Sequence, residues 1–330
     1  MQPLLEVQDL RVSFPVRGGE VQAVRGIGFH VQPGEAVAIV GESGCGKSVT
    51  AQAIMRLLPQ HPARIREGTI RFQGKDLLRL KEREMQSIRG KDIGMIFQDP
   101  MTSLNPTMTI GRQITEVLHK HQRLTASEAK RRAIDMLELV GIPHPASRFS
   151  QYPHEFSGGM RQRAMIAMAL ACRPALLIAD EPTTALDVTI QAQILRVLKS
   201  LQREFGTSII LITHDLGIVA DLCDRVIVMY AGQIVETGTK REIFKQPQHP
   251  YTRGLLRSLP RIDRSKDEPL VPIYGTPPDL SNPPSGCPFW ARCGDAMRIC
   301  RERLPGTTAI GETHSASCWL LHPLAREVAR

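Results

Sequence analysis

Eight consecutive residues near the N-terminus have the types and spacing needed to bind phosphate. The pattern GxxxxGK[ST] is matched by Gly41-Glu42-Ser43-Gly44-Cys45-Gly46-Lys47-Ser48. Glycines let successive backbone N–H groups point into one concavity at a helix N-terminus, where unpaired donors and the helix dipole favour an anion. Lys47 can reach the terminal phosphates of a nucleotide, and the Ser48 hydroxyl can bind Mg²⁺. The sequence therefore predicts a nucleoside triphosphate site.

The residues around this loop support that interpretation. Residues 36–40 are an apolar run that predicts a buried strand, and residues 49–58 are compatible with a helix that stops before Pro59. A strand, a glycine-rich loop and a helix are the context of a true phosphate loop, which argues against a turn that binds nothing. Phe14 ends an earlier expected strand, where its ring could lie against the base or in the core. The residues predicted to contact ATP are Phe14, Gly41, Ser43, Gly44, Cys45, Gly46, Lys47, Ser48 and Val49.

Three further polar side chains follow apolar runs that predict strands. Asp180 and Glu181 come directly after residues 176–179, and His214 follows residues 208–213. The carboxyl ends of parallel strands meet at one edge of a sheet, where α/β folds bind ligands. We expect Asp180 to hold Mg²⁺, Glu181 to polarise the attacking water and His214 to contact the γ-phosphate. Each residue alone would suit a capping or core-edge position, but the combination favours hydrolysis.

Strand and helix patterns alternate along the first 260 residues, which predicts an α/β fold with a mainly parallel sheet. Residues 4–14 and 20–31 alternate in polarity as strands do and predict an additional, antiparallel β part. A mostly helical block at about 99–172 interrupts the alternation and predicts an inserted helical subdomain. One helix of this block begins at the capping box Thr125-Ala126-Ser127-Glu128 and ends at Gly141.

The composition is that of an ordinary globular protein. Of 330 residues, 42% are hydrophobic and 23% are charged. The longest apolar stretches, such as residues 164–172, have roughly half of the ~20 residues that a membrane-spanning helix needs, and no signal-peptide pattern opens the chain. We therefore expect the chain to stay in the cytosol. The net charge of +9 could serve nucleic acid, anionic lipid or a triphosphate, but the positive residues are dispersed along the sequence, which favours a solvated surface with a basic bias.

After about residue 260 the composition shifts to Pro, Gly, Arg and Cys, which predicts a separate C-terminal extension over residues 261–330. It has too few apolar residues for a core of its own and therefore needs a staple. Four cysteines spaced C-x₅-C-x₆-C-x₁₇-C suit tetrahedral zinc or an iron–sulfur cluster, and their spacing does not choose between the two. Free buried thiols are the third alternative, and His314 and His322 are spare ligands that four cysteines make unnecessary. The cysteines are Cys287, Cys293, Cys300 and Cys318.

Five motifs in this order resemble those of the ATP-binding subunits of ABC transporters: the phosphate loop, Gln98, Ser157-Gly158-Gly159, Asp180-Glu181 and His214. The resemblance covers residues 1 to about 260 and implies a P-loop NTPase fold of the ABC ATPase type. It implies ATP hydrolysis with Glu181, His214 and Gln98 as catalytic residues. It also implies Mg²⁺ bound through Ser48, Gln98 and Asp180.

The signature stretch departs from the usual family form, Leu-Ser-Gly-Gly-Gln. Here it is Phe156-Ser157-Gly158-Gly159-Met160, and Ser157 is a good N-cap for the expected helix behind it. In this family the signature serves ATP bound by the opposite subunit. The resemblance therefore assigns Ser157, Gly158 and Gly159 to the partner's nucleotide, with Asp187 at the dimer seam. Met160 has no side-chain amide, so the contact made by the family's glutamine is not carried over.

Two further stretches, residues 95–106 and 249–252, resemble the oligopeptide, dipeptide and nickel importers. They imply an energy-coupling ATPase subunit of a di- or oligopeptide importer, with nickel chelates and glutathione-like cargo as open alternatives. The implied partners are a second ATPase subunit, often a non-identical chain, two transmembrane permeases and an extracytoplasmic substrate-binding protein. The implied location is peripheral, at the cytoplasmic face of the cell inner membrane.

C-terminal extensions of this branch carry similar cysteines around Pro-Phe and Arg-Cys pairs. This chain has Cys287-Pro288-Phe289 and Arg292-Cys293 at the corresponding places. The resemblance therefore implies a [4Fe–4S] cluster in a structural role, and zinc is the alternative.

A soluble ABC ATPase that acts on DNA or the ribosome is a rival from another functional class. Such proteins usually carry two ATPase cores in one chain, or long coiled-coil arms with sustained heptads. The sequence has neither feature, so we expect no nucleic-acid partner. A nucleotide-binding regulator that no longer hydrolyses ATP is a further alternative, but the presence of both Glu181 and His214 argues against it.

Overall fold

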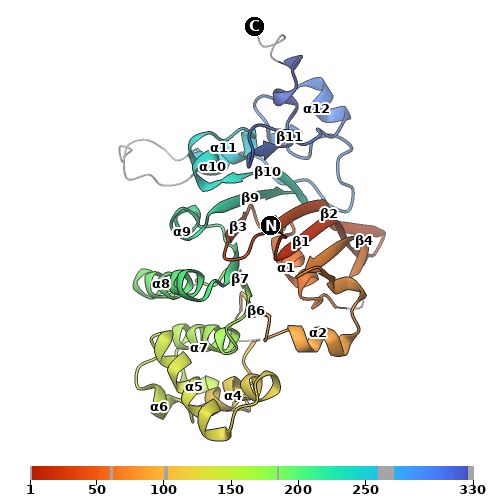
Figure 1. Ribbon diagram of the computed structural model, residues 1–330. Coiled ribbons are helices and arrows are strands. Elements are labelled where there is room, and N and C mark those ends of the chain that lie inside the picture. Colours follow the sequence, from red (N-terminus) through yellow and green to blue (C-terminus); the bar gives the residue numbers. More distant parts are fainter. Residues whose placement is uncertain (1, 60–61, 100–102, 184–185, 259–270, 326–330) are drawn as a thin grey trace. The chain divides into compact units, whose positions relative to one another are not determined.

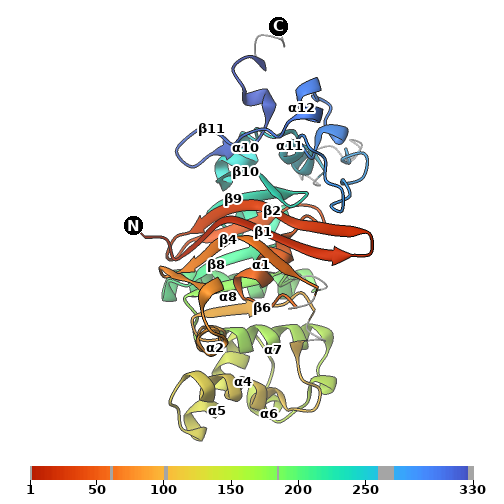
Figure 2. The ribbon, with the colours of Figure 1, turned by 90° about the vertical axis from the view of Figure 1, so that its right-hand side faces the viewer.

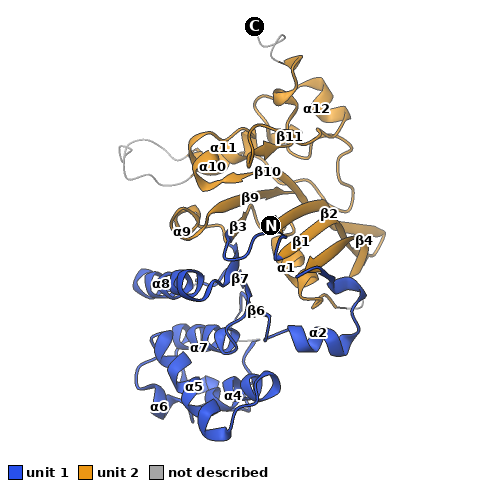
Figure 3. Ribbon diagram, viewed as in Figure 1, with its two compact units in different colours: residues 1–4, 31–36, 73–212 blue, residues 5–30, 37–72, 213–330 orange. Residues whose placement is uncertain are grey.

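The structure is a computed structural model, and it describes residues 2–59, 62–99, 103–183, 186–258 and 271–325. Its contacts divide the chain into two compact units (Figure 3). Unit 1 comprises residues 1–4, 31–36 and 73–212, and unit 2 comprises residues 5–30, 37–72 and 213–330. Both units are therefore assembled from segments that are far apart in the sequence.

Unit 2 contains the antiparallel strands predicted at the N-terminus. Strand β1 (Leu5–Val16) lies between β2 (Gly19–Val31) and β4 (Arg64–Phe72), and it pairs antiparallel with β4 (Figures 1 and 2). The alternation of buried residues along β1 changes phase at Asp9, which has a φ of 46° and lies in a register shift, as in a β-bulge. The buried apolar side chains of this strand are Leu5, Val7, Leu10 and Val12.

A second group of strands in unit 2 has the order β11-β12-β10-β9-β3. Strand β3 (Ala36–Val40) is buried throughout and pairs parallel with β9 (Arg225–Tyr230). Strands β9 and β10 (Gln233–Thr239) form a hairpin, and Ala231 and Gly232 at its tip both have positive φ, as a tight two-residue turn requires. The helices that the structure describes in this unit are α1 (Lys47–Ile54), α9 (Leu216–Leu222), α10 (Lys240–Lys245), α11 (Pro250–Arg257) and α12 (Arg298–Glu302).

The C-terminal extension adds strands to the edge of this group. Strand β12 (Ser315–Ala316) pairs antiparallel with β10 and with β11 (Thr308–Ala309). Beyond β12, the Ser317 N–H donates to the Val235 carbonyl at 2.9 Å. The extension is therefore attached to the hairpin through its backbone. The boundary expected near residue 260 lies outside the described residues.

Unit 1 contains the predicted parallel strands. Strand β7 (Leu176–Asp180) pairs parallel with β6 (Ile93–Ile96) on one side and with β8 (Ser208–Ile212) on the other. Every residue of these three strands is buried, as the continuous apolar runs predict. Asp180 lies opposite Ile212 at the carboxyl end of the set. The expectation of a mainly parallel α/β fold with an antiparallel part is confirmed.

The remaining elements of unit 1 are mostly helices, and α4 to α7 lie together in Figure 1. The α5 start is the expected capping box, because Thr125 N donates to the Glu128 carboxylate at 2.8 Å and Glu128 N donates to Thr125 Oγ1 at 3.3 Å. None of the helices among the described residues is long and apolar enough to cross a membrane. The elements are β5 (Lys75–Asp76), α2 (Glu82–Ile88), α4 (Ile110–His121), α5 (Ala126–Leu139), α6 (Pro145–Arg148), α7 (Gly158–Leu170) and α8 (Val188–Phe205).

Candidate nucleotide-binding site

The predicted phosphate loop connects β3 to α1 in unit 2. At both ends it packs so closely against backbone that a larger residue would collide. A Cβ on Gly41 would lie 2.2 Å from the Met229 carbonyl oxygen, and one on Gly46 would lie 2.4 Å from the Ala23 carbonyl oxygen. Gly46 is also the N-cap of α1, with a φ of 99°. These two positions require glycine, which explains why the loop has this spacing.

Lys47 lies inside the concavity of the loop and is 7% exposed. Its ammonium group donates to the Gly41 carbonyl at 2.8 Å and to the Glu42 carbonyl at 2.9 Å, and it lies 3.7 Å from the Cys45 sulfur. Burial raises the pKa of the Cys45 thiol, and the nearby Lys47 opposes this shift. The loop therefore holds a positive charge above the first turn of α1, where phosphate oxygens can replace the carbonyls as acceptors.

Three of the residues predicted to bind Mg²⁺ or to catalyse hydrolysis lie in unit 1. Asp180 ends β7 and is 3% exposed. Glu181 follows with a φ of 48°, and its N–H donates to the Ile212 carbonyl at 2.9 Å. Gln98 Nε2 donates to Glu181 Oε2 at 3.3 Å. Left-handed backbone at a non-glycine residue is a strained conformation that often marks a functional position.

The signature stretch begins helix α7, as expected from its N-cap. Ser157 Oγ accepts a hydrogen bond from Met160 N at 3.3 Å, and Gly158 and Gly159 form the first turn. Gln162, one turn further on, is buried and donates to the Pro182 carbonyl. Sequence reasoning missed this link between the signature helix and the chain after Glu181; the only signal was a polar residue at a position that α7 buries.

The other predicted residues have local roles that can be described separately. Asp187 is the N-cap of α8, and its carboxylate accepts from Ile190 N at 2.9 Å. His214 is exposed and directly precedes Asp215, which caps α9. Phe14 is half-buried on β1. His214, Phe14 and the phosphate loop belong to unit 2, whereas Asp187, Gln98, Asp180, Glu181 and the signature belong to unit 1.

The four cysteines of the extension are all free thiols, two of them buried and two half-buried. Burial raises the pKa of Cys287 to about 12 and that of Cys318 to about 11, and the other thiols of the group add to both shifts. The four sulfur atoms are therefore within electrostatic range of one another. Among the described residues, however, three or more His, Cys, Asp or Glu side chains nowhere come close enough to hold a single metal ion.

Each of these four sulfurs also has a backbone N–H donor. The donors to Cys287, Cys293 and Cys318 are the N–H groups two residues further on, at Phe289, Asp295 and Leu320, and each lowers the pKa of its thiol. Met297 N lies 3.4 Å from the Cys300 sulfur. Such N–H···S contacts favour thiolate over thiol, which is the form that binds a metal.

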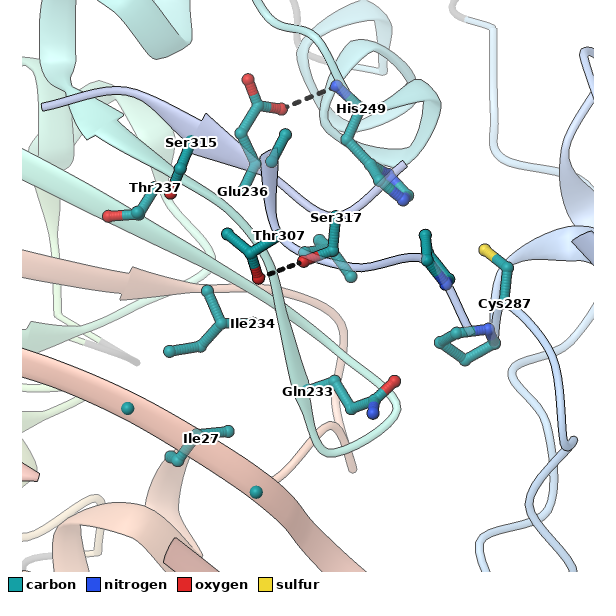
Figure 4. Close-up of a pocket in the computed structure, with 16 residues that line it drawn as sticks. Ile27, Gln233, Ile234, Glu236, Thr237, His249, Cys287, Thr307, Ser315 and Ser317 are labelled. Carbon is teal, nitrogen blue, oxygen red and sulfur yellow. Dashed lines mark hydrogen bonds between the residues drawn. The ribbon is translucent and has the colours of Figure 1, made fainter. Parts of the chain in front are cut away.

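His314, one of the two spare histidines, has a carboxylate as its partner. His314 is buried and its Nε2 lies 2.8 Å from Glu236 Oε1. Glu236 also accepts from Gln248 N and His249 N, at 2.7 and 2.9 Å. A cavity of about 220 Å³ lies beside this group, between Ile27 of β2 and Cys287 of the extension (Figure 4). The sequence predicted neither the cavity nor the role of the Glu236 carboxylate. The hydrogen-bond partners of Glu236 are distant along the chain, so no local pattern reveals them.

Comparison with known proteins identifies two regions. Residues 24–184 match the family model of the ABC transporter, and residues 235–300 match that of the oligopeptide/dipeptide transporter C-terminal region. The oligopeptide transport ATP-binding protein OppD of Bacillus subtilis is 63% identical over 98% of this chain and 91% of its own length. The dipeptide transport ATP-binding protein DppD of the same organism is 59% identical over 97% and 95%.

Solved structures give the same result for the fold. The dimeric ATP-binding cassette MJ0796 bound to ADP and Pi superposes with a TM-score of 0.66 and 27% identity, over 72% of this chain and 99% of that one. The fold expected from the motif order is thereby confirmed. The chain belongs to the ABC transporter family, in the branch of oligopeptide and dipeptide transport ATP-binding proteins.

Proposed function

We propose that this chain is the ATP-hydrolysing, energy-coupling subunit of an importer for di- and oligopeptides. The observation that carries the proposal is the identity with oligopeptide and dipeptide transport ATP-binding proteins over nearly the whole chain, C-terminal region included. Nickel chelates and glutathione-like cargo are the alternatives. An ABC ATPase acting on nucleic acid is disfavoured, because no relative described above has such a role.

The phosphate loop of unit 2 is the proposed ATP site. Lys47 binds the terminal phosphates, and the N–H groups of residues 43–49 bind the others. Ser48, Gln98 and Asp180 offer only oxygen ligands, which fits Mg²⁺, and the buried Asp180 carboxylate suits a hard cation. When bound, the ion would neutralise phosphate charge. Glu181 then acts as general base on the attacking water, oriented by its hydrogen bond from Gln98.

His214 and the signature complete this assignment. His214 contacts the γ-phosphate and steadies the water, and Phe14 lies against the base. Ser157, Gly158 and Gly159 bind the nucleotide of a second ATPase subunit, because a helix N-terminus with an open glycine at its first turn attracts phosphate. Asp187 contributes at the same subunit seam.

The proposed domains are an ABC ATPase domain at residues 1–260, with its helical subdomain at about 99–172, and a C-terminal extension at residues 261–330. The proposed partners are a second, non-identical ATPase subunit, two transmembrane permeases and an extracytoplasmic substrate-binding protein. With them the chain sits peripherally at the cytoplasmic face of the inner membrane. The dipeptide and oligopeptide transport proteins to which it is similar support this assembly.

For the extension we propose a [4Fe–4S] cluster held by Cys287, Cys293, Cys300 and Cys318. The support is the resemblance of the stretches around Cys287 and Cys293 to the cysteine-rich extensions of this branch, and four sulfurs that accept N–H bonds suit ligation of either a cluster or zinc. The cluster would supply a structural cross-link. Anaerobically purified protein should be brown, with about four irons per chain. Colourless protein with one zinc per chain would overturn the cluster assignment and would make zinc the structural cross-link of the extension.

The cargo is tested in a transporter reconstituted from this chain, its permeases and its binding protein. ATP hydrolysis should rise when the binding protein carries a di- or oligopeptide and should stay at the basal rate with a nickel chelate or glutathione. Stimulation by the nickel chelate alone would replace the peptide assignment with the nickel alternative. Stimulation by DNA in the absence of permeases would overturn both.

A further inference from the structure

The C-terminal extension contacts the phosphate loop through one arginine. The side chain of Arg292, directly before Cys293, is 5% exposed. Its Nη1 lies 2.6 Å from Glu42 Oε2, and its Nη2 lies 2.9 Å from Glu42 Oε1. This is a bidentate pair, which combines charge with a fixed geometry. Glu42 is the second residue of the phosphate loop, so the pair joins the nucleotide site to a residue 250 positions away.

Arg292 is itself held from several sides. Its Nη2 also donates to the Ile273 carbonyl at 3.1 Å, its Nε to the Tyr274 carbonyl at 3.0 Å, and its Nη1 to the Tyr230 hydroxyl at 3.2 Å. With Glu42, these acceptors use all five N–H donors of the guanidinium. The same group lies 5.7 Å from the Tyr230 ring centre and 5.9 Å from that of Phe289. A lysine has too few donors and the wrong geometry to replace it.

Glu42 is fixed at its backbone as well as at its carboxylate. Its N–H donates to the hydroxyl of the fully buried Tyr251 at 2.8 Å, and its carbonyl accepts from Lys47 at 2.9 Å. The next loop residues, Ser43 and Gly44, are exposed. The C-terminal part of the chain therefore contacts the phosphate loop at Glu42, through Tyr251 and Arg292. Any displacement of this residue moves an acceptor of the lysine that binds phosphate.

The charge of Glu42 gives a second reason for the pair. A carboxylate in a phosphate loop repels the anion that the loop binds, and partial burial strengthens that repulsion. The bidentate pair neutralises the carboxylate and directs both its oxygens to Arg292. Without Arg292, a partly buried and unpaired negative charge would remain beside the phosphates.

We propose that Arg292 is a positioning residue for ATP, through which the C-terminal extension sets the conformation and the charge of the phosphate loop. The inference rests on the proposed ATP binding and extends it: the extension takes part in nucleotide handling. Arg292 acts through Glu42, the loop residue that it pairs with.

The test is titration of the full-length chain with a fluorescent ATP analogue. Arg292→Ala should weaken binding about tenfold, the effect expected when a charged hydrogen-bonded partner is lost. Adding Glu42→Gln to Arg292→Ala should recover most of that loss, because the unpaired carboxylate is then gone. Arg298→Ala is the matched control, since it removes an exposed ion pair with Glu302 in the same extension. It should change the affinity less than about twofold.

The readouts separate positioning from general stability. Recovery by Glu42→Gln is not expected from a loosened fold, and iron and zinc content measured in each variant excludes an indirect effect through the cysteines. Wild-type affinity in folded Arg292→Ala would overturn the inference. If Arg292→Ala does not fold, Arg292→Lys serves instead, with a smaller expected loss of about threefold, and wild-type affinity there would overturn it too. Absence of binding by the unsubstituted chain would instead overturn the proposed function.

Discussion

The phosphate loop and the C-terminal extension both contain little regular structure, and they keep their shapes in different ways. In the loop, Gly41 and Gly46 lie so close to neighbouring backbone that only glycine fits at either position. The extension is fixed by residues from elsewhere, such as Glu236, which binds His314, and Glu42, which binds Arg292. The loop can therefore be recognised from the spacing of its own glycines, whereas the contacts of the extension can be found only in the folded structure.

The largest effect is expected where ATP hydrolysis alone is removed and the phosphate loop and the extension are unchanged. Glu181→Gln removes the proposed general base and leaves the phosphate loop intact. We expect ATP affinity to stay near the unsubstituted value while turnover in the assembled transporter falls by about 10²- to 10⁴-fold, the usual value of a positioned base. The check is steady-state hydrolysis beside nucleotide titration, with Lys47→Ala as the control that should lose binding instead. Undiminished hydrolysis would remove Glu181 from the base role.

Cys293→Ser should weaken the extension without weakening the loop equally. If the four cysteines hold a structural centre, losing one ligand removes a cross-link, and lost cross-links typically cost about 2–4 kcal/mol. We expect bleaching of the protein, lower metal content and faster proteolysis within residues 271–325. Cys172→Ser is the matched control, because that cysteine is buried in unit 1 far along the chain from the group. A metal-free wild type with equal protease resistance in both variants would favour free thiols.

Two glycine substitutions should show which constraint on the loop is stronger, close approach to backbone or left-handed backbone conformation. Gly41→Ala places a Cβ 2.2 Å from a backbone oxygen and should lower the free energy of unfolding by about 3 kcal/mol. Gly44→Ala meets nothing within 4 Å, but Gly44 has a φ of 79°, so only about 1 kcal/mol is expected. Urea unfolding of the two variants checks the order. Equal losses would show that backbone conformation, not close approach, dominates in this loop.

A further prediction concerns the pH dependence of stability and His249, the N-cap of α11. Burial lowers the pKa of His249 to about 3, from an ordinary value of 6.5. As the pH falls below 6.5, His249 becomes protonated in the unfolded chain, whereas in the folded chain it stays neutral until the pH approaches 3. The stabilisation from the neutral histidine is therefore complete above pH 6.5 and is lost as the pH falls toward 3. At pH 5 the loss should be about 2 kcal/mol.

The control for this prediction is His249→Asn, which keeps a side-chain acceptor for Tyr251 N at the start of α11. The difference between the free energies of unfolding at pH 7.5 and pH 5 should shrink in this variant. If the wild type and the variant have the same pH dependence, His249 is not the group responsible.

The same contrast explains what the sequence could predict. Helix α5 began at its capping box and α7 began behind Ser157, because caps are decided by residues within one turn. The buried parallel strands also followed from local apolar runs, whereas the short strands β11 and β12 of the extension were not predicted. Asp180 and Glu181 could be placed because strand ends meet at one edge of a sheet.

The remainder depended on contacts that no local pattern carries. His314 looked like a spare metal ligand, but it pairs with Glu236, which lies 78 positions away. Arg292 stood out only as part of an Arg-Cys pair, and its role comes from Glu42. Gln162 gave no signal beyond its polarity. In each case a buried charged or polar group found its partner through the tertiary fold, as such groups must.

The measurement that tests the central claim most directly is ATP-driven peptide uptake into vesicles that carry the reconstituted transporter. With the unsubstituted chain, a labelled di- or oligopeptide should accumulate when ATP is present on the side of this subunit. With Lys47→Ala the vesicles should accumulate none above background, while assembly with the permeases is unchanged. Equal uptake with both chains, or uptake that does not require ATP, would contradict the claim that this chain couples ATP hydrolysis to peptide import.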